Sequence, residues 1–237
     1  MFDHVDIRVS DRKASEAFYD TVLRTLGIEQ TANDEQLVEW DEFSIADDGP
    51  VTRRLHIGFR AAGHAEVDAF WQAGIDAGYR DDGKPGPRPQ YVEDYYGAFL
   101  LDPDGNSVEA VWHGDMRGGM IDHLWLRVAD VDAAERFYAT IAPHAGLTVK
   151  RHGPDHVQCV GAKSSFSLVA GTPTEHTHIA FPASDDETVQ AFHRAGVEAG
   201  YRDNGGPGER PVYHPGYYGA FLLDPDGNNV EVVNHHR

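Results

Sequence analysis

The chain carries nearly the same fourteen-residue segment twice, at a spacing close to half of its 237 residues. Residues 96–109 read YGAFLLDPDGNSVE and residues 218–231 read YGAFLLDPDGNNVE, so 13 of 14 positions are identical at an offset of 122. The openings FDHVDIRVSD (from Phe2) and IDHLWLRVAD (from Ile121) match at an offset of 119. A unit of roughly 118 residues is too long for a solenoid repeat and has the length of an ordinary domain. The sequence therefore predicts two similar domains, 1–115 and 119–237, joined by the glycine-rich segment 114–119.

Composition and charge exclude several classes of function. The formal net charge is −19, from 20 basic and 39 acidic residues, which disfavours nucleic acid because its binding draws on Lys and Arg. An acidic surface either keeps a protein soluble or attracts a cationic ligand. The single cysteine, Cys159, has no partner within the chain, and no run of 18 apolar residues or signal segment is present. We expect a cytoplasmic protein that contacts neither nucleic acid nor a membrane.

Hydrophobic periodicity predicts the order strand, helix, three strands twice in each half. Residues 4–9 and 123–128 alternate apolar and polar side chains, as expected of a strand with one apolar face. Segments with helical spacing follow at 14–26, 65–77, 131–142 and 187–199. Strands are predicted at 37–40, 43–46, 55–59, 98–101, 107–112, 156–160, 165–169, 178–181, 220–223 and 229–234. The segments 83–89 and 205–211, rich in Gly and Pro, are predicted as loops, and Asp-Pro-Asp-Gly at 102–105 and 224–227 as turns. The prediction is an α+β fold of four βαβββ modules.

Histidine and glutamate occupy matching positions in the two copies. The first set is His4, His56 and Glu109, and the second is His123, His178 and Glu231. Two imidazoles and a carboxylate form a common ligand set for a divalent transition metal and leave positions open for substrate. A lone histidine is more often a core or surface residue. However, residues 30–48 barely resemble 149–170, so the histidines were retained while their surroundings diverged. We predict one site for Fe, Mn, Ni or Zn in each half.

The whole chain resembles two fused domains of the vicinal oxygen chelate superfamily, which includes glyoxalase I, extradiol dioxygenases and bleomycin-binding proteins. The motifs that carry the resemblance are DHVDIRVSD followed by FYD or FYA, the HI pairs at 56–57 and 178–179, and FLLDPDGNNVE. The resemblance implies curled mixed sheets with outer helices. It also implies a concave metal site built from a first-strand His, a fifth-strand His and an eighth-strand Glu. The metal would act as a Lewis acid on vicinal oxygens and stabilise an oxyanion.

Departures from the superfamily pattern restrict the choice of reaction. Glyoxalase I-like enzymes usually add a Glu on the fourth strand, but the segments here read FSI at 43–45 and FSL at 166–168. Extradiol dioxygenases place a Tyr ten residues before the metal Glu, where this chain has Phe99 and Phe221. Both departures count against catechol ring cleavage by the usual machinery.

Two residues in the second half are candidate catalytic groups. His214 lies in YHPGYY, where the first copy has Val92, and a histidine there acts either as a general acid or base or as an ordinary loop residue. Tyr218, like its neighbour Tyr217, either donates a hydrogen bond to an oxyanion or packs before a strand.

These observations favour a metal-dependent lyase, isomerase or dioxygenase that acts on a small-molecule substrate. We expect His123, His178 and Glu231 to form the better site. The alternative is a non-catalytic, bleomycin-resistance-like binding protein that uses the same cavity. The fusion of two copies is compatible with a monomer that mimics a dimer or with a homodimer.

Overall fold

The computed structural model describes residues 1–114, 118–162 and 164–236. Residues 115–117 of the predicted linker lie outside this part of the chain. None of the helices in the described part has the length and apolarity needed to span a bilayer.

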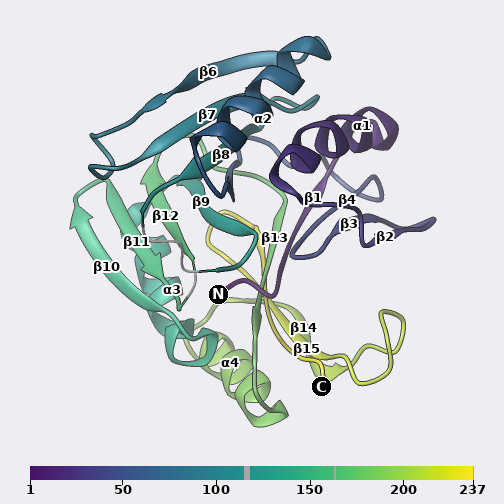
Figure 1. The fold of residues 1–237 in the computed structure, drawn as a ribbon. Helices are drawn as coiled ribbons and strands as arrows, with labels where there is room; N and C mark the ends of the chain where they lie inside the picture. Colours follow the sequence, from purple (N-terminus) through teal and green to yellow (C-terminus); the bar gives the residue numbers. More distant parts are fainter. Residues whose placement is uncertain (115–117, 163, 237) are drawn as a thin grey trace. The chain divides into compact units, whose positions relative to one another are not determined.

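The elements follow the predicted order of four modules (Figure 1). The first module comprises β1 (His4–Arg8), α1 (Arg12–Leu23), a 3-10 turn (Arg24–Leu26), β2 (Ala32–Asn33), β3 (Val38–Trp40) and β4 (Phe43–Ala46). The second comprises β5 (His56–Arg60), α2 (His64–Asp76), β6 (Arg80–Pro87), β7 (Tyr96–Leu101) and β8 (Ser107–Trp112). The third comprises β9 (Ile121–Val128), α3 (Val131–Ala145), β10 (Thr148–Gly153), β11 (His156–Val160) and β12 (Ser165–Ala170). The fourth comprises β13 (Thr177–Pro182), α4 (Asp186–Glu198), β14 (Arg202–Glu209), β15 (Tyr218–Leu223) and β16 (Asn229–Asn234).

The strands form two mixed sheets of eight strands each, which confirms the predicted α+β class. Their orders are β14-β15-β16-β13-β1-β4-β3-β2 and β10-β11-β12-β9-β5-β8-β7-β6. Each sheet therefore joins one module from the first sequence repeat to one from the second. In the second module β5 runs parallel to β8, and in the fourth module β13 runs parallel to β16. The neighbouring pairs β7–β8 and β15–β16 are antiparallel.

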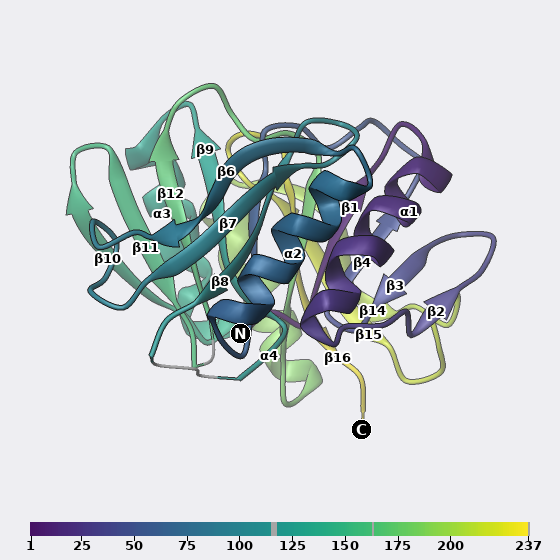
Figure 2. The ribbon, with the colours of Figure 1, turned by 45° about the horizontal axis from the view of Figure 1, so that its top comes forward.

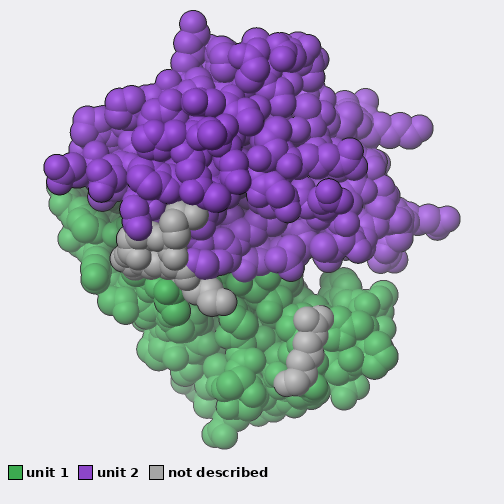
Figure 3. All heavy atoms as spheres, in the orientation of Figure 1, with its two compact units in different colours: residues 1–5, 126–237 green, residues 6–125 purple. Residues whose placement is uncertain are grey.

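The chain divides into two compact units, residues 1–5 with 126–237 and residues 6–125 (Figure 3). The boundaries fall inside the strands that open the two sequence repeats, between Val5 and Asp6 in β1 and between Trp125 and Leu126 in β9. As a consequence, His4 belongs to the unit that contains β13 and β16, and His123 belongs to the unit that contains β5 and β8. The predicted boundaries 1–115 and 119–237 describe the sequence repeat, and stay a prediction for the domains.

The helices that follow the opening strands begin at aspartate caps. Asp11 accepts a hydrogen bond from the Ala14 amide at 3.0 Å, and Asp130 accepts one from the Ala133 amide at 2.9 Å. Each helix buries an apolar face at helical spacing; the fully buried members are Phe18, Tyr19, Val22, Leu23, Phe137, Tyr138 and Ile141. Within the compact unit of residues 6–125, α1 and α2 lie side by side (Figure 2), and α2 covers β6, β7 and β8.

Most of each segment predicted as a Gly- and Pro-rich loop, residues 83–87 and 205–209, instead belongs to an edge strand, β6 or β14. Proline and glycine are tolerated there because one side of an edge strand makes no ladder hydrogen bonds. The register of β6 against β7 shifts around Gly83, and that of β14 against β15 shifts around Gly205. The prediction of loops was therefore wrong for these residues. It failed because no residue of β6 or β14 is buried, so neither strand has an apolar face that would produce an alternating pattern.

The Asp-Pro-Asp-Gly turns are each locked by a buried asparagine. In the second copy, the Asn228 side chain accepts from the Thr177 amide at 3.1 Å and donates to the Thr174 carbonyl at 3.1 Å. It also donates to Asp224 Oδ2 at 3.1 Å, and Asn106 makes the equivalent contacts in the first copy. The asparagine thus ties the turn to the segment that leads into β13.

We expect Asn228→Ala to lower the free energy of unfolding by about 2–3 kcal/mol, because it leaves buried backbone groups without partners. Urea denaturation measures this change. The control is Asn229→Ser, which introduces the residue of the first copy at the next position and should change stability by less than about 0.5 kcal/mol. Equal stability of the two variants would show that the buried amide contributes nothing.

Candidate metal centres

The six predicted ligands meet in two clusters, but not in the predicted combinations. In each cluster, one ligand atom from every residue lies within 4.8 Å of the others; the clusters are centre A (His4, His178 and Glu231) and centre B (His56, Glu109 and His123). The prediction that each half supplies its own three ligands was therefore wrong. The first-strand histidines are exchanged, because β1 lies beside β13 and β9 lies beside β5.

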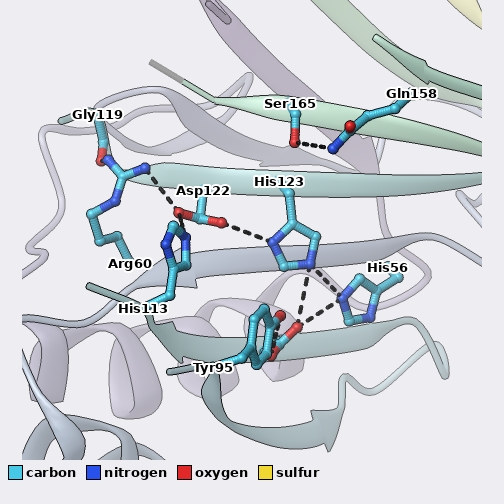
Figure 4. Close-up of polar contacts among 10 residues, drawn as sticks. His56, Arg60, Tyr95, His113, Gly119, Asp122, His123, Gln158 and Ser165 are labelled. Atoms are coloured by element: carbon cyan, nitrogen blue, oxygen red, sulfur yellow. Dashed lines mark hydrogen bonds and ion pairs between the residues drawn. The ribbon is translucent and has the colours of Figure 1, made fainter. Parts of the chain in front are cut away.

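Centre B holds its three ligand atoms close together (Figure 4). His56 Nε2 lies 3.0 Å from Glu109 Oε2, and His123 Nε2 lies 3.3 Å from the same oxygen. The two Nε2 atoms are 3.1 Å apart. Each residue comes from a different strand, β5, β8 or β9, and Glu109 is 1% exposed. A single buried carboxylate oxygen thus faces two imidazole nitrogens.

Glycine makes room for these side chains on the neighbouring strands. Gly58 lies opposite His123 in the β5–β9 ladder, and a Cβ on Gly58 would stand 2.5 Å from Cε1 of the imidazole. A Cβ on Gly97 would stand 2.3 Å from Oε1 of Glu109, and one on Gly219 would stand 2.4 Å from Oε1 of Glu231. The glycine of the repeated YGAF segment is therefore required by the close approach of the glutamate.

Centre A has the same plan with a looser first histidine. His178 Nε2 lies 2.9 Å from Glu231 Oε2, and His4 Nε2 lies 3.5 Å from it. The two imidazole rings are 5.1 Å apart between centroids and nearly perpendicular, at 77°. Glu231 is fully buried, so its carboxylate faces the two imidazoles and not the solvent.

A tyrosine holds the other oxygen of each glutamate. The Tyr95 hydroxyl donates to Glu109 Oε1 at 2.7 Å, and the Tyr217 hydroxyl donates to Glu231 Oε1 at 2.7 Å. Because Oε1 is engaged in this way, Oε2 is the oxygen left to face a cation. These tyrosines precede β7 and β15, so strand alternation does not single them out. The candidate Tyr218 lies elsewhere, and its hydroxyl accepts a hydrogen bond from Gln190 at 3.1 Å.

Aspartates orient the two first-strand histidines. Asp122 accepts from Nδ1 of His123 at 3.0 Å and is held in turn by Arg60 at 2.9 Å and His113 at 3.0 Å (Figure 4). With Nδ1 bonded to the aspartate, Nε2 is the ring nitrogen of His123 that faces the cluster.

The corresponding aspartate of centre A is Asp3, which lies 2.9 Å from His4 Nδ1 and 2.9 Å from His235 Nε2. The candidate His214 contacts the far side of His235, with Nε2 2.8 Å from Nδ1. His214 is therefore not in the cluster; it reaches His4 only through His235 and Asp3. Its catalytic role stays a prediction.

Both glutamates are ionised at neutral pH. Burial alone would raise the pKa of Glu109, but hydrogen bonds from His123 and His56 outweigh burial and hold the pKa below its ordinary value. The same balance lowers the pKa of Glu231. For His123, burial opposes the charged form, yet hydrogen bonds with Asp122 and Glu109 raise the pKa to about 9. Burial lowers the pKa of His56. The shared proton of centre B thus resides on His123, where a cation would displace it.

The donor set fits a divalent transition metal. Two imidazole nitrogens and one anionic oxygen converge in each centre, which matches the ligands preferred by Fe, Mn, Ni and Zn. Three protein ligands leave further coordination positions for substrate oxygens. The aspartates that orient the histidines, buried Asp122 and half-buried Asp3, are of the kind found behind metal ligands in proteins.

We expect Tyr217→Phe to weaken divalent-ion binding at centre A about tenfold, because Glu231 loses the hydrogen bond that fixes its orientation. Isothermal titration with Zn²⁺ measures the affinity. Tyr218→Phe is the matched control at the adjacent position and should leave the affinity unchanged. Equal affinities in all three proteins would show that the Tyr217 hydroxyl has no effect on the centre.

A family model matches nearly the whole chain. The model of the Glyoxalase/Bleomycin resistance protein/Dioxygenase superfamily matches residues 1–110 and 120–232. The chain therefore belongs to this superfamily and carries its domain twice, as the motifs predicted.

Solved structures that align with nearly the whole chain show the same fold. Glyoxalase I from Zea mays superimposes with a TM-score of 0.71 at 18% identity, over 99% of this chain and 92% of the maize chain. A glyoxalase/bleomycin resistance protein from Albidiferax ferrireducens is 35% identical over 47% of this chain and 98% of its own, with a TM-score of 0.43. No curated protein matches the sequence.

Proposed function

We propose that the protein is a metal-dependent enzyme, a lyase, isomerase or dioxygenase, that acts on a small molecule with two adjacent oxygens. The observation that carries the proposal is a buried carboxylate oxygen facing two imidazole nitrogens, present in both centres. A divalent ion bound there would supply Lewis-acid stabilisation of an oxyanion that develops on the substrate.

The residues around the ligands have separate roles in this proposal. Tyr95 and Tyr217 fix the glutamates, so that Oε2 keeps its position while substrate binds. Asp122 and Asp3 hold the Nδ1 atoms of the first-strand histidines. His214 lies outside centre A, where it contacts His235 and through it supports the position of Asp3.

Among the three reaction types, proton-transfer chemistry is favoured over ring cleavage. Phe99 and Phe221 occupy the positions where extradiol dioxygenases carry a tyrosine, so that group is missing from both copies. A lyase or isomerase needs a stabilised oxyanion and a proton acceptor, and it needs no redox change of the metal.

The experiment is to load the protein separately with Fe²⁺, Mn²⁺, Ni²⁺ and Zn²⁺ and to follow two reactions. Deuterium exchange at the carbon next to the carbonyl of an α-hydroxyketone reports oxyanion formation, and oxygen uptake with a catechol reports dioxygenase activity. We expect metal-dependent exchange that is abolished by chelation. If neither reaction occurs and metal-free protein binds bleomycin as tightly as loaded protein, the non-catalytic alternative replaces this proposal.

A further inference from the structure

Aromatic side chains gather beside centre B. The Trp125 ring lies opposite His56 in the β5–β9 ladder, with ring centroids 6.1 Å apart. The centroid of the Phe99 ring, on β7, lies 5.9 Å from that of the His56 ring. Tyr91 contacts Trp125 at 5.9 Å and Tyr95 at 5.1 Å. The imidazole of a proposed metal ligand is thus flanked by two aromatic rings, with a third close to them.

One of these rings is unusually exposed. Among the described residues, four of the five large exposed apolar side chains lie just before Tyr95 and Tyr217; they are Tyr91 (48%), Val92 (52%), Val212 (70%) and Tyr213 (58%). Exposed apolar side chains that cluster beside a polar site mark a surface for ligand contact. Trp125 and Phe99 are half-buried.

Centre A lacks the tryptophan. The repeat position of Trp125 is Asp6, which lies two residues after His4 on the same face of β1 and accepts a hydrogen bond from Ser44 at 2.7 Å. The other two aromatic positions are retained as Phe221 and Tyr213. The two copies therefore differ at this position, which holds a large apolar ring (Trp125) in one copy and a carboxylate (Asp6) in the other.

We propose that centre B selects a chelating ligand that carries a planar aromatic group next to its two oxygens, and that Trp125 is the residue that sets this preference. Trp125 offers its ring to such a group, and Tyr91 extends the aromatic surface outwards. The Phe99 ring, over which the Arg88 guanidinium lies at 5.5 Å, borders this surface. Centre A, with Asp6 at this position, does not share the preference. The inference rests on the proposed metal-binding function.

The test compares benzohydroxamate with acetohydroxamate, which present the same two oxygens with and without an aromatic ring. Each centre is examined alone in the Zn²⁺-loaded protein, centre B in Glu231→Ala and centre A in Glu109→Ala. Calorimetry gives both affinities. At centre B we expect benzohydroxamate to bind about tenfold more tightly, an advantage of about 1.4 kcal/mol, which is the size of an aromatic contact. At centre A we expect a difference of less than about twofold.

Adding Trp125→Ala to Glu231→Ala should reduce the advantage at centre B to that of centre A. Tyr91→Ala, a substitution of an exposed residue that leaves the fold intact, should reduce it partly. An equal preference at the two centres, or a preference that survives both substitutions, overturns the assignment to Trp125 while metal binding stands. Failure of the parent protein to take up Zn²⁺ overturns both this inference and the proposed function.

Discussion

Replacing Glu231 with alanine should lower the divalent-ion content of the purified protein from two ions per chain to one. Glu231 is the only carboxylate among the three ligands of centre A, and its Oε2 lies 2.9 Å from His178 and 3.5 Å from His4. Two neutral imidazoles alone hold a divalent ion weakly, so the loss should exceed the factor of about 100 caused by changes behind metal ligands. Elemental analysis of dialysed protein measures the content.

Two further variants make this result specific. Glu231→Gln keeps the side-chain shape and an acceptor for the Tyr217 hydroxyl, so it separates loss of charge from loss of packing. Glu198→Ala removes an exposed carboxylate at the end of α4 and should retain both ions. If Glu231→Ala and Glu231→Gln both keep two ions per chain, Glu231 is not a metal ligand.

Gly97→Ala should remove the ion of centre B while leaving centre A and the fold largely intact. The added Cβ would stand 2.3 Å from Glu109 Oε1, at the end of a side chain that Tyr95 holds in place. The carboxylate must therefore move, and it loses both its contact with Tyr95 and its position between the histidines. We expect ion binding at centre B to weaken about 100-fold, with a change in unfolding free energy within the range of about 1–3 kcal/mol for a modest overpacking.

The duplicated chain supplies the control for this substitution. Gly219→Ala places a Cβ 2.4 Å from Glu231 Oε1, so it should affect centre A and spare centre B. Zinc titration of each variant, in a background that lacks the other centre, reads the two affinities separately. Unchanged affinity at centre B in Gly97→Ala would show that the exact position of Glu109 is not needed for binding.

The sequence was sufficient to predict which residues form the two clusters but not how they are grouped. Retention of His and Glu in two diverged copies identified all six residues of the clusters. However, His4 and His123 occupy equivalent positions in the two repeats. The motif and the strand alternation around them are the same, so neither indicates which cluster each histidine joins. The grouping depends on which strand lies beside β5 and β13, and that is set by tertiary packing between modules.

Other differences also have local physical causes. The tyrosines that hold the glutamates, Tyr95 and Tyr217, precede their strands, where alternation does not apply, so each was indistinguishable from the tyrosine after it. The strands β2 and β10 were not predicted. They lie in the segments where the two copies diverged most, so one copy could not be used to identify the strand in the other. The buried faces of α1 and α3, in contrast, follow directly from residues such as Phe18 and Phe137 at helical spacing.

The most direct test of the account is the ion content of two double variants. Because His4 and Glu231 share centre A, His4→Ala with Glu231→Ala should retain one ion per chain at centre B. His4→Ala with Glu109→Ala damages both centres and should retain none. The opposite result, no ion in the first variant and one in the second, would show that each sequence repeat builds its own centre and would contradict the exchange of first-strand histidines.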